Sequence, residues 1–550
     1  MKTLFKVSIF LGISLFLVAC GQLITRTTSP TATITATIIP SFTTTIEPTV
    51  TKAYATPTRP TSIPTIDPTH IPEILSKAFS IKALEGVNGH TMQQVTGWKN
   101  GLGGGFLYTS CTGYIWLDTE HLLLYPATGQ VDLPEGWSPA KINVVRQPVV
   151  INLKNGLAWL PPVKAPASPE TCDTIEWSSK LGILILPEDS DSVSTVSTYT
   201  YDGFKLASYP GRLLDVSPSG TKVLLEDNTV IDLQTNKKTT LTWELDINQE
   251  PFHYDSYWTA DETRIFRCCY YYADLSAGIS YHSERSDFQN TNDSQRESWG
   301  LLEMGGWIQN DTYFLPQWNW LDYGDISHLP MIDPARRVVI DAREKAGIPE
   351  DWSCTAMYTS PDGKYVWLTG FGDSYLIDLI NFKAQYYPRE TYSSVYWSPD
   401  SKFALLENYD SSNINHQYFN LLSLSNNKIQ SLDIKDLSAF WYGWWHPTDH
   451  VFAYISEDSQ KLVLFNIETM STQELTSPVT FQSYTWSPKG DRIALVAEDG
   501  SVWQIDYPAL ENFEQLTPSI SGVRGAEWSP DGKFISFVGI SDIYIVETNK

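Results

Sequence analysis

The chain is poor in basic residues. Its 550 residues contain 38 Lys and Arg against 63 Asp and Glu, which gives a formal net charge of −25. An acidic surface repels phosphate groups, and this argues against nucleic acid as a partner. It also argues against a folded part that lies directly on an anionic membrane. We therefore expect the folded part to have neither of these two partners.

Cysteine and histidine are scarce, with six and nine copies. Cys20 belongs to an N-terminal motif described below, which leaves an odd number of cysteines elsewhere. Export permits disulfides, and Cys111 with Cys172 is the first candidate pair. Adjacent Cys268 and Cys269 would point to opposite faces of a strand. The spacing of the cysteines is not that of a zinc site, and the histidines form no ligand cluster, so we expect no metal.

Catalytic motifs are absent from the sequence. There is no G-x-S-x-G nucleophile elbow, no P-loop, no H-E-x-x-H helix and no EF-hand loop. Residues 360–363 (Ser-Pro-Asp-Gly) place glycine one position too early for a sialidase-type Asp-box. We therefore expect neither catalysis nor a cofactor. The alternative is a glycan hydrolase or lyase, because the many carboxylates could supply a catalytic pair, although the sequence does not select two of them.

The N-terminal apolar run is too short for a membrane span. Residues 7–19 are thirteen uncharged residues after the basic Lys2 and Lys6, and a bilayer needs about 20 apolar residues. The pattern is that of a signal peptide over 1–19. Residues 17–21 (Leu-Val-Ala-Cys-Gly) resemble the lipobox of bacterial lipoproteins. That resemblance implies diacylglycerol transfer to the Cys20 thiol and cleavage before Cys20, so that acyl chains hold the protein at the extracytoplasmic face of the cell membrane.

Residues 20–75 predict a linker. Thr and Pro make up half of residues 23–72, which contain no Gly and few charges. Such a composition cannot bury an apolar core, and we expect a disordered, extended stalk. At about 3.1 Å per residue its upper reach is roughly 150 Å. Whether it carries O-linked glycans or is a plain spacer stays open.

A short phrase recurs through the C-terminal third of the chain. Prolines 361, 399, 447, 488 and 530 lie in versions of Trp-Ser-Pro-Asp-Gly and are 38, 48, 41 and 42 residues apart. Strand-rich units with periods near 40–45 residues indicate a β-propeller with one four-stranded blade per unit. Residues 76–550, about 475 residues rich in apolar and aromatic side chains, are long enough for such a domain.

The phrase predicts the turn between the first two strands of each blade. Pro presets φ, Asp accepts a backbone hydrogen bond, and Gly takes the left-handed position that closes the hairpin. In one unit, strands are expected at 482–486, 492–496 and 502–506. The preceding Trp would pack between neighbouring blades. The repeated Asp is therefore interpreted as structural and not as catalytic.

Weaker copies extend the repeat upstream. Candidate units lie at 216–220, 258–261 and 177–179, and degenerate ones at 114–118 and 307–310. Together with the five clear copies this makes about ten units, more than the usual four to eight blades. We interpret some of the weak units as insertions and expect an all-β propeller of eight blades, with seven as the alternative.

The Trp-Ser-Pro-Asp-Gly-Lys phrase followed by an apolar strand resembles the TolB-type, WD-repeat-like propeller repeat, and is also similar to the propellers of prolyl-oligopeptidase-type peptidases. The resemblance is specific over about 355–547 and looser over 110–354. It does not extend to the helical N-terminal domain of TolB or to a hydrolase domain. It implies an extracytoplasmic protein that acts through protein contacts.

The function expected from these features is a lipid-anchored, surface-displayed binding or scaffolding module with a protein or glycan partner. Residues 276–299 form an irregular insertion that is either a binding loop or decoration. The last unit lacks a fourth strand. We expect residues 78–84 to supply it by pairing antiparallel with 543–546, because an open ring would leave sheet edges unpaired.

Overall fold

The structure is a computed structural model, and it contains almost only β-strands. The residues it describes are 80–96, 114–124, 127–132, 141–145, 148–162, 175–189, 194–242, 256–267, 271–282, 305–316, 328–349, 351–388, 392, 394–410, 413–435, 445–456, 460–523, 525–540 and 542–548. The expected signal peptide, Cys20 and the stalk lie outside this part of the chain. Among the described residues, no helix is long and apolar enough to cross a membrane.

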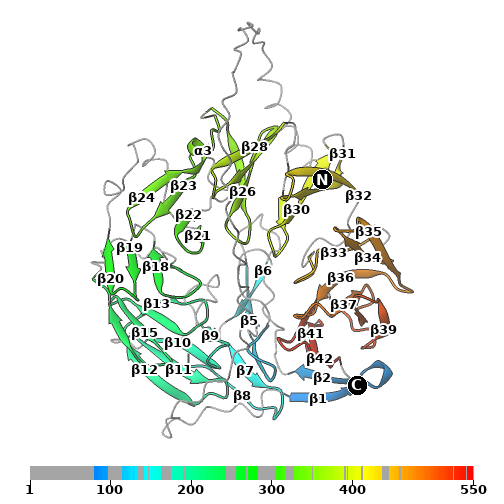
Figure 1. Cartoon of the computed structure of the whole chain (residues 1–550). Helices are drawn as coiled ribbons and strands as arrows, with labels where there is room; N and C mark the ends of the chain where they lie inside the picture. Colours follow the sequence, from blue (N-terminus) through cyan, green and yellow to red (C-terminus); the bar gives the residue numbers. More distant parts are fainter. Residues whose placement is uncertain are drawn as a thin grey trace, which may run out of the picture. The chain divides into compact units, whose positions relative to one another are not determined.

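The first five blades are four-stranded antiparallel sheets (Figure 1). Blade 1 contains β3 (Tyr114–Trp116), β4 (His121–Leu124), β7 (Val149–Asn152) and β8 (Ala158–Trp159). Blade 2 contains β9 (Glu176–Ser178), β10 (Ile183–Asp189), β11 (Ser194–Thr200) and β12 (Lys205–Pro210). Blade 3 contains β13 (Leu213–Val216), β14 (Lys222–Leu225), β15 (Thr229–Asp232) and β16 (Lys238–Thr240). Blade 4 contains β17 (Ser256–Trp258), β18 (Arg264–Arg267), β19 (Tyr271–Asp274) and β20 (Ile279–His282). Blade 5 contains β21 (Gly305–Ile308), β22 (Tyr313–Pro316), β23 (Pro330–Asp333) and β24 (Val338–Asp341), followed by the short helix α3 (Ala342–Lys345).

Five further blades follow in chain order. Blade 6 contains β25 (Cys354–Thr359), β26 (Tyr365–Gly370), β27 (Asp373–Asp378) and β28 (Lys383–Pro388). Blade 7 contains β29 (Ser394–Trp397), β30 (Phe403–Asp410), β31 (Asn413–Ser423) and β32 (Lys428–Lys435). Blade 8 contains β33 (Val451–Ile455), β34 (Lys461–Asn466) and β35 (Ser471–Thr476), with the isolated bridge of Trp445 to Phe452 in the inner position. Blade 9 contains β36 (Phe481–Trp486), β37 (Arg492–Ala497), β38 (Val502–Asp506) and β39 (Glu511–Gln515). Blade 10 contains β40 (Ala526–Trp528), β41 (Phe534–Val538) and β42 (Ile543–Glu547), completed by β2 (Thr91–Thr96) and β1 (Ser80–Glu85).

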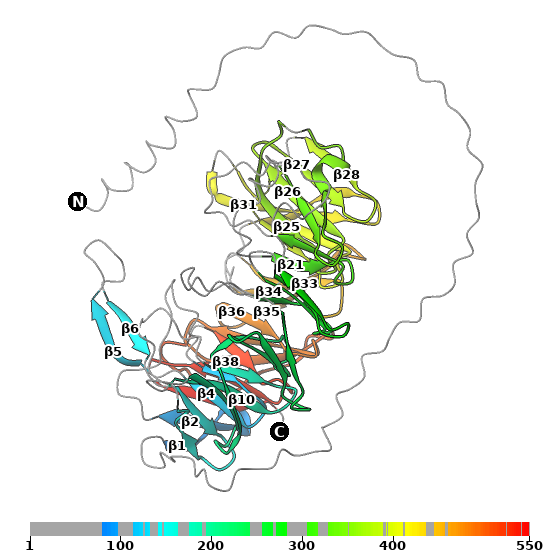
Figure 2. The same ribbon diagram turned by 90° about the vertical axis from the view of Figure 1, so that its left-hand side faces the viewer.

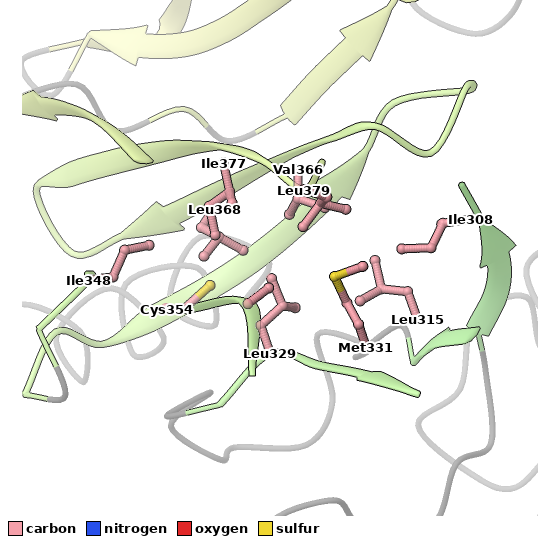
Figure 3. Close-up of a cluster of buried hydrophobic side chains, with 11 residues drawn as sticks. Ile308, Leu315, Leu329, Met331, Ile348, Cys354, Val366, Leu368, Ile377 and Leu379 are labelled. Atoms are coloured by element: carbon pink, nitrogen blue, oxygen red, sulfur yellow. The ribbon is translucent and has the colours of Figure 1, made fainter. Parts of the chain in front are cut away.

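Ten hydrophobic clusters join the blades, and each cluster combines side chains from two consecutive blades. Between blades 5 and 6, for example, Leu315 and Met331 of one blade pack with Leu368 of the next, and all three are fully buried or nearly so (Figure 3). Another cluster joins blade 10 to blade 1, so that the sequence of interfaces closes on itself. Burial of apolar surface between blades is therefore the main force that holds the ring together.

The expectation of eight blades, with seven as the alternative, is wrong. The described residues form ten blades, which have four strands each except for three in blade 8 and five in blade 10. Every candidate unit in the sequence is a blade, including the two degenerate units that begin with Tyr114 and Trp307. The tryptophans of these units still donate a hydrogen bond to a neighbouring blade, Trp307 to the Tyr257 carbonyl of blade 4 and Trp116 to the Ser536 hydroxyl of blade 10. The degenerate units have lost the turn phrase but have kept the residues that form the interface.

Burial along each blade explains its sequence pattern. The inner strand β36 alternates, whereas the second strand β37 is an apolar run buried at five of its six positions. A second strand lies between two neighbouring sheets and is covered on both faces, so it has no polar side. The last strand of blade 8, β35, is exposed at five of six positions and is polar. In blade 9, β36, β37 and β38 contain the three strands expected from the sequence.

The turn phrase has the predicted geometry. In blade 10, the Gly532 N–H donates to the Ser529 carbonyl at 2.8 Å, and Gly532 has a φ of +74°. The Ser529 hydroxyl donates to Asp531 at 2.8 Å, and Asp531 accepts from the Lys533 N–H at 3.1 Å. The repeated Asp therefore closes a hairpin, as predicted, and its carboxylate is occupied by the turn.

The ring closes through the N-terminal strands, but the strand that pairs with the last one is not the predicted strand. β2 pairs antiparallel with β42, with Met92 opposite Val546, and β1 is added outside β2 as a fifth strand (Figure 1). The prediction that 78–84 pairs directly with 543–546 is therefore wrong, although the described part of that segment is in the last blade. The β2 residues Met92 and Val95 are 2% and 0% exposed. The better-buried strand takes the inner position because it can bury side chains against two neighbouring blades.

A two-stranded hairpin interrupts blade 1. β5 (Ala127–Asp132) and β6 (Lys141–Val145) pair only with each other and lie between β4 and β7 in the chain. Figure 2 shows them as a separate pair of strands. The hairpin is therefore an insertion in blade 1 and does not add a blade.

Candidate binding pocket at the inner strands

In several blades, a tryptophan at the end of the inner strand links the blade to the one before it. The Nε1 of Trp528 donates to the Thr485 carbonyl at 3.2 Å, and the same contact recurs from Trp445 to Tyr396 at 3.1 Å. The acceptor is each time the residue just before the equivalent position in the preceding blade. The contact also joins Trp397 to the Tyr358 carbonyl at 3.3 Å. The prediction that these tryptophans pack between adjacent blades is confirmed.

A pocket of about 580 Å³ lies where the inner strands of four consecutive blades meet. Blades 9, 10, 1 and 2 contribute its walls through β36, β40, β3 and β9. The lining residues are mostly aromatic or apolar: Tyr114, Ile115, Trp116, Trp177, Thr485, Trp486, Pro488, Glu527 and Trp528. Since the inner strands of a propeller surround its central channel, the pocket is on the channel side of the blades.

Packing behind the pocket holds its aromatic walls in place. Trp116 is stacked on Phe534 at 6.5 Å between ring centroids. The guanidinium of Arg492 lies 4.9 Å from the ring centre of Trp528. Trp486 is in edge contact with His446 at 4.8 Å. Because each of these three tryptophans is only 8–9% exposed, the walls are rigid and largely preformed.

Glu527 has the only ionisable carboxyl group among the lining residues. By surface area it is exposed, but it is surrounded by protein on the channel side, and this partial burial raises the pKa of its carboxyl. Because its side chain is exposed to solvent, the carboxyl of Glu527 can still carry a negative charge.

Tyr114 lies beside this carboxylate. Its hydroxyl accepts a hydrogen bond from Ser536 at 3.1 Å. Burial, and after it the negative charge of Glu527, raises the pKa of Tyr114 far above its ordinary value. The phenol is therefore neutral at any physiological pH, and the pocket carries a single negative charge on otherwise uncharged walls.

The buried indole nitrogen of Trp486 also belongs to the pocket wall. It has no hydrogen-bond partner among the described residues. In blades 7, 8 and 10 the equivalent indole nitrogen donates to a carbonyl of the preceding blade. We therefore interpret this nitrogen as part of the link between blades and not as a ligand donor.

The structure does not describe the sites predicted from the sequence. Cys20, Cys111 and Cys172, like Cys268 and Cys269, are outside the described residues, so the lipidation site and the disulfide stay predictions. Cys354 is buried and its thiol donates to the Ala356 carbonyl at 3.2 Å. Among the described residues, no three His, Cys, Asp or Glu side chains gather as a metal site would require.

The insertion predicted at 276–299 begins in an ordinary hairpin. Residues 276–282 belong to the turn after β19 and to β20, the last strand of blade 4. Its Ser276 hydroxyl donates to Asp274 at 2.6 Å, which closes this turn. Residues 283–299 lie outside the described part, and their role as a binding loop is not decided.

The pocket itself was missed by sequence reasoning. Glu527 comes directly before the Trp at the end of an inner strand, where other blades have Tyr257, Tyr396 and Thr485 but blades 2 and 3 also have carboxylates, Glu176 and Asp215. The sequence alone therefore does not single out Glu527. That position faces the channel only once the inner strands are placed around it.

Comparisons with known proteins add little beyond the fold. No family model and no curated protein matches the chain. Among solved structures, it is similar to a TolB-type protein from Agrobacterium tumefaciens, with 21% identity over 34% of this chain and 69% of that chain. The TM-score of this match is 0.24, too low for any inference about function.

Proposed function

We propose that the protein is a lipid-anchored binding module of the bacterial cell envelope, and that its propeller binds a ligand in the pocket at the inner strands. The observation that carries this proposal is the character of the pocket. It is rigid, walled mainly by aromatic side chains, and carries one charge. Pockets of 300–1,000 Å³ with apolar walls and few polar groups are the usual form of small-ligand sites.

Anchoring supports the same role. Acylation of Cys20, followed by a stalk of up to roughly 150 Å when fully extended, would hold the propeller away from the acidic membrane surface. The net charge of −25 favours such a separation because like charges repel. The module would then sample ligands outside the cytoplasm or present a bound ligand to a protein or glycan partner.

The residues that line the pocket do not favour catalysis. Hydrolysis of a glycosidic bond ordinarily uses two carboxyl groups, one as acid and one as base or nucleophile. The pocket lining includes Glu527 but no second Asp or Glu. The hydroxyls of Thr485 and Tyr114 are beside it, with no histidine in the lining to activate them.

A propeller enzyme is the alternative, and one observation favours it. The pKa of Glu527 is raised by its surroundings, and a carboxyl with a raised pKa is a common general acid. Since a single residue could act on a reactive substrate without a partner, binding and turnover must be measured together.

Ligand-observed NMR on the propeller, with a set of chemically diverse small solutes, measures both in one sample. We expect at least one solute to show line broadening on addition of protein and to stay chemically intact over hours. Thr485→Arg, which places a long side chain in the pocket, should abolish the broadening. Thr472→Arg, the same change on the exposed strand β35, should not.

Two results would contradict the proposal. Binding that survives Thr485→Arg while both variants unfold at the wild-type temperature would place the site elsewhere. Conversion of a bound solute, lost in Glu527→Gln, would favour the enzyme. Either result leaves the ten-blade fold untouched and concerns only the use of the pocket.

A further inference from the structure

The charge of the pocket at the inner strands is not balanced by the protein. No hydrogen bond or ion pair joins the carboxylate of Glu527 to another described residue, and burial is the only influence on its pKa. Some acidic groups elsewhere in the protein have a basic partner: Asp531 has Lys533 at 2.8 Å, and Glu262 has Lys222 at 3.2 Å. An unpaired carboxylate beside partly desolvated walls is a group whose charge a bound ligand can neutralise.

The aromatic walls of the pocket also favour a positively charged ligand. The lining contains four tryptophans and one tyrosine, and it contains no Lys, Arg or His. Aromatic rings attract cations through their quadrupole, and Trp does so most strongly. Trp528 already accepts a cation in this way, because the Arg492 guanidinium lies 4.9 Å from its ring centre on the side of blade 9.

Other ligand classes fit less well. An anion would meet the charge of Glu527 with no basic side chain in the lining. A sugar presents many hydroxyl groups, whereas the polar side chains of the lining are those of Thr485, Tyr114 and Glu527. Each buried hydroxyl without a partner would cost binding free energy. A wholly apolar ligand would desolvate Glu527 without compensation.

From these contacts we propose that the pocket binds an organic ammonium group, with Glu527 as the counter-ion and the tryptophans as the apolar, π-rich walls. This inference rests on the proposed function, since it names the ligand class of the same pocket. The negative field of the whole protein, with its net charge of −25, would raise the local concentration of such cations. Two sources share this chemistry: a free quaternary ammonium compound, and the Lys side chain of a peptide.

Choline and its neutral carbon isostere, 3,3-dimethyl-1-butanol, form the decisive pair of probes. They have the same shape and differ in the positive charge. By isothermal titration with Trp fluorescence as a second readout, we expect choline to bind at least tenfold more tightly than the isostere. N-acetyl-lysine methylamide in the same titration distinguishes the sources: tighter binding than choline indicates a peptide, and weaker binding a free quaternary ammonium compound.

Glu527→Gln is the main variant, because it removes the charge and keeps the shape. It should weaken choline binding at least tenfold and leave the isostere unchanged. Glu527→Asp, which keeps the charge, should retain the preference for choline. Glu511→Gln on the exposed β39 is the matched control, and its choline affinity should equal that of the wild type.

The outcomes separate this inference from the proposed function. Equal affinities for choline and the isostere, both lost in Thr485→Arg, would overturn the ammonium proposal and keep a binding pocket. Binding of a sugar or an anion in place of either probe would overturn it in the same way. Choline affinity unchanged in Glu527→Gln, with the variant folded, would remove Glu527 as the counter-ion and refute the inference.

Discussion

The indole nitrogen of Trp116 lies 2.7 Å from the hydroxyl oxygen of Ser536, although the two residues are 420 positions apart. Trp116 ends the inner strand of blade 1, and Ser536 lies in the second strand of blade 10. The Ser536 hydroxyl in turn donates to the hydroxyl of Tyr114 at 3.1 Å. The first and last blades are thus joined by a buried polar contact directly behind the wall of the pocket.

Removal of this acceptor should destabilise the ring. Ser536→Ala leaves the buried Trp116 N–H without its partner, and we expect a loss of about 1–3 kcal/mol in the free energy of unfolding. Urea unfolding followed by circular dichroism measures it. The double variant with Trp116→Phe should be less destabilised than the sum of the two single variants. Simple additivity would show that the hydrogen bond does not contribute.

The closure of the ring predicts a sharp boundary for truncation. Proteins that begin at residue 80 should unfold like the full chain. Proteins that begin at residue 97 lack β1 and β2, expose the edge of β42 and lose the buried Met92 and Val95. We expect them to aggregate or to lose cooperative unfolding in calorimetry. A start at residue 91 removes only β1 and should give an intermediate stability. Cooperative unfolding of the shortest protein would contradict closure through β2.

Local parts of this fold were predictable from the sequence. The strand expected at 502–506 is β38 without a change of bounds, because alternation and turn residues are properties of neighbours in the chain. The blade number was not predictable in the same way. The blade 1 unit begins with Tyr114 and has no Ser-Pro turn, and only its buried contacts with blades 10 and 2 identify it as a blade.

The candidate site could not be predicted from local sequence patterns, for a related reason. Glu527 and Tyr114 are neighbours only because β2 completes blade 10 and so brings blade 1 against it. The sequence pattern indicates that each residue is in an inner strand, but not which inner strands meet. Cys20 is the opposite case, since its motif is read within five consecutive residues.

Cys20 therefore gives a prediction that does not depend on the fold. Cys20→Ser should prevent acylation, so that the protein leaves the membrane fraction or accumulates as an unprocessed precursor. Detergent phase partitioning and labelling with an alkyne-tagged fatty acid measure the two effects. Cys354→Ser, at a buried cysteine of the propeller, is the control and should keep the label. Unchanged partitioning and processing of Cys20→Ser would refute the lipid anchor.

Two turn glycines allow the strain of a turn to be separated from a steric clash. Gly490 and Gly532 have φ of +75° and +74°. A Cβ at Gly490 would lie 2.3 Å from the buried His446 ring, whereas one at Gly532 would meet no atom closer than 3.6 Å. Gly532→Ala should cost about 1–2 kcal/mol through backbone strain alone, and Gly490→Ala about 1–3 kcal/mol more through overpacking. Thermal unfolding of the two variants measures the difference, and equal costs would show that the His446 ring moves aside freely.

A charge cluster between blades 1 and 2 gives the stability of the protein a pH dependence. His121 lies 3.0 Å from Asp118 and 3.2 Å from Asp202 of the next blade. Burial opposes the charged imidazolium, but the hydrogen bonds and charges of the two carboxylates outweigh it and raise the pKa of His121 to about 9. The same contacts with His121 lower the pKa of both carboxyls, against the opposing effect of burial. The Asn152 amide donates to Asp202 at 3.0 Å and completes the cluster.

Because the folded pKa of His121 lies above its ordinary value of 6.5, its contribution is complete below pH 6.5 and is lost as the pH rises from 6.5 through 9. The carboxyl pKa values are lowered, so their contribution is lost only as the pH falls below about 4. His121→Gln should therefore destabilise the protein most between pH 4 and 6.5, by roughly 2–3 kcal/mol after allowance for the half-exposed carboxylates. The deficit should shrink as the pH rises from 6.5 to 9 and should be smallest above pH 9. Urea unfolding of both proteins across this range measures the difference, and subtraction removes the other titrating groups, including His450 between Asp400 and Glu468. A deficit that stays constant from pH 5 to 10 would mean that His121 is neutral in the folded protein and that the cluster is held by hydrogen bonds alone.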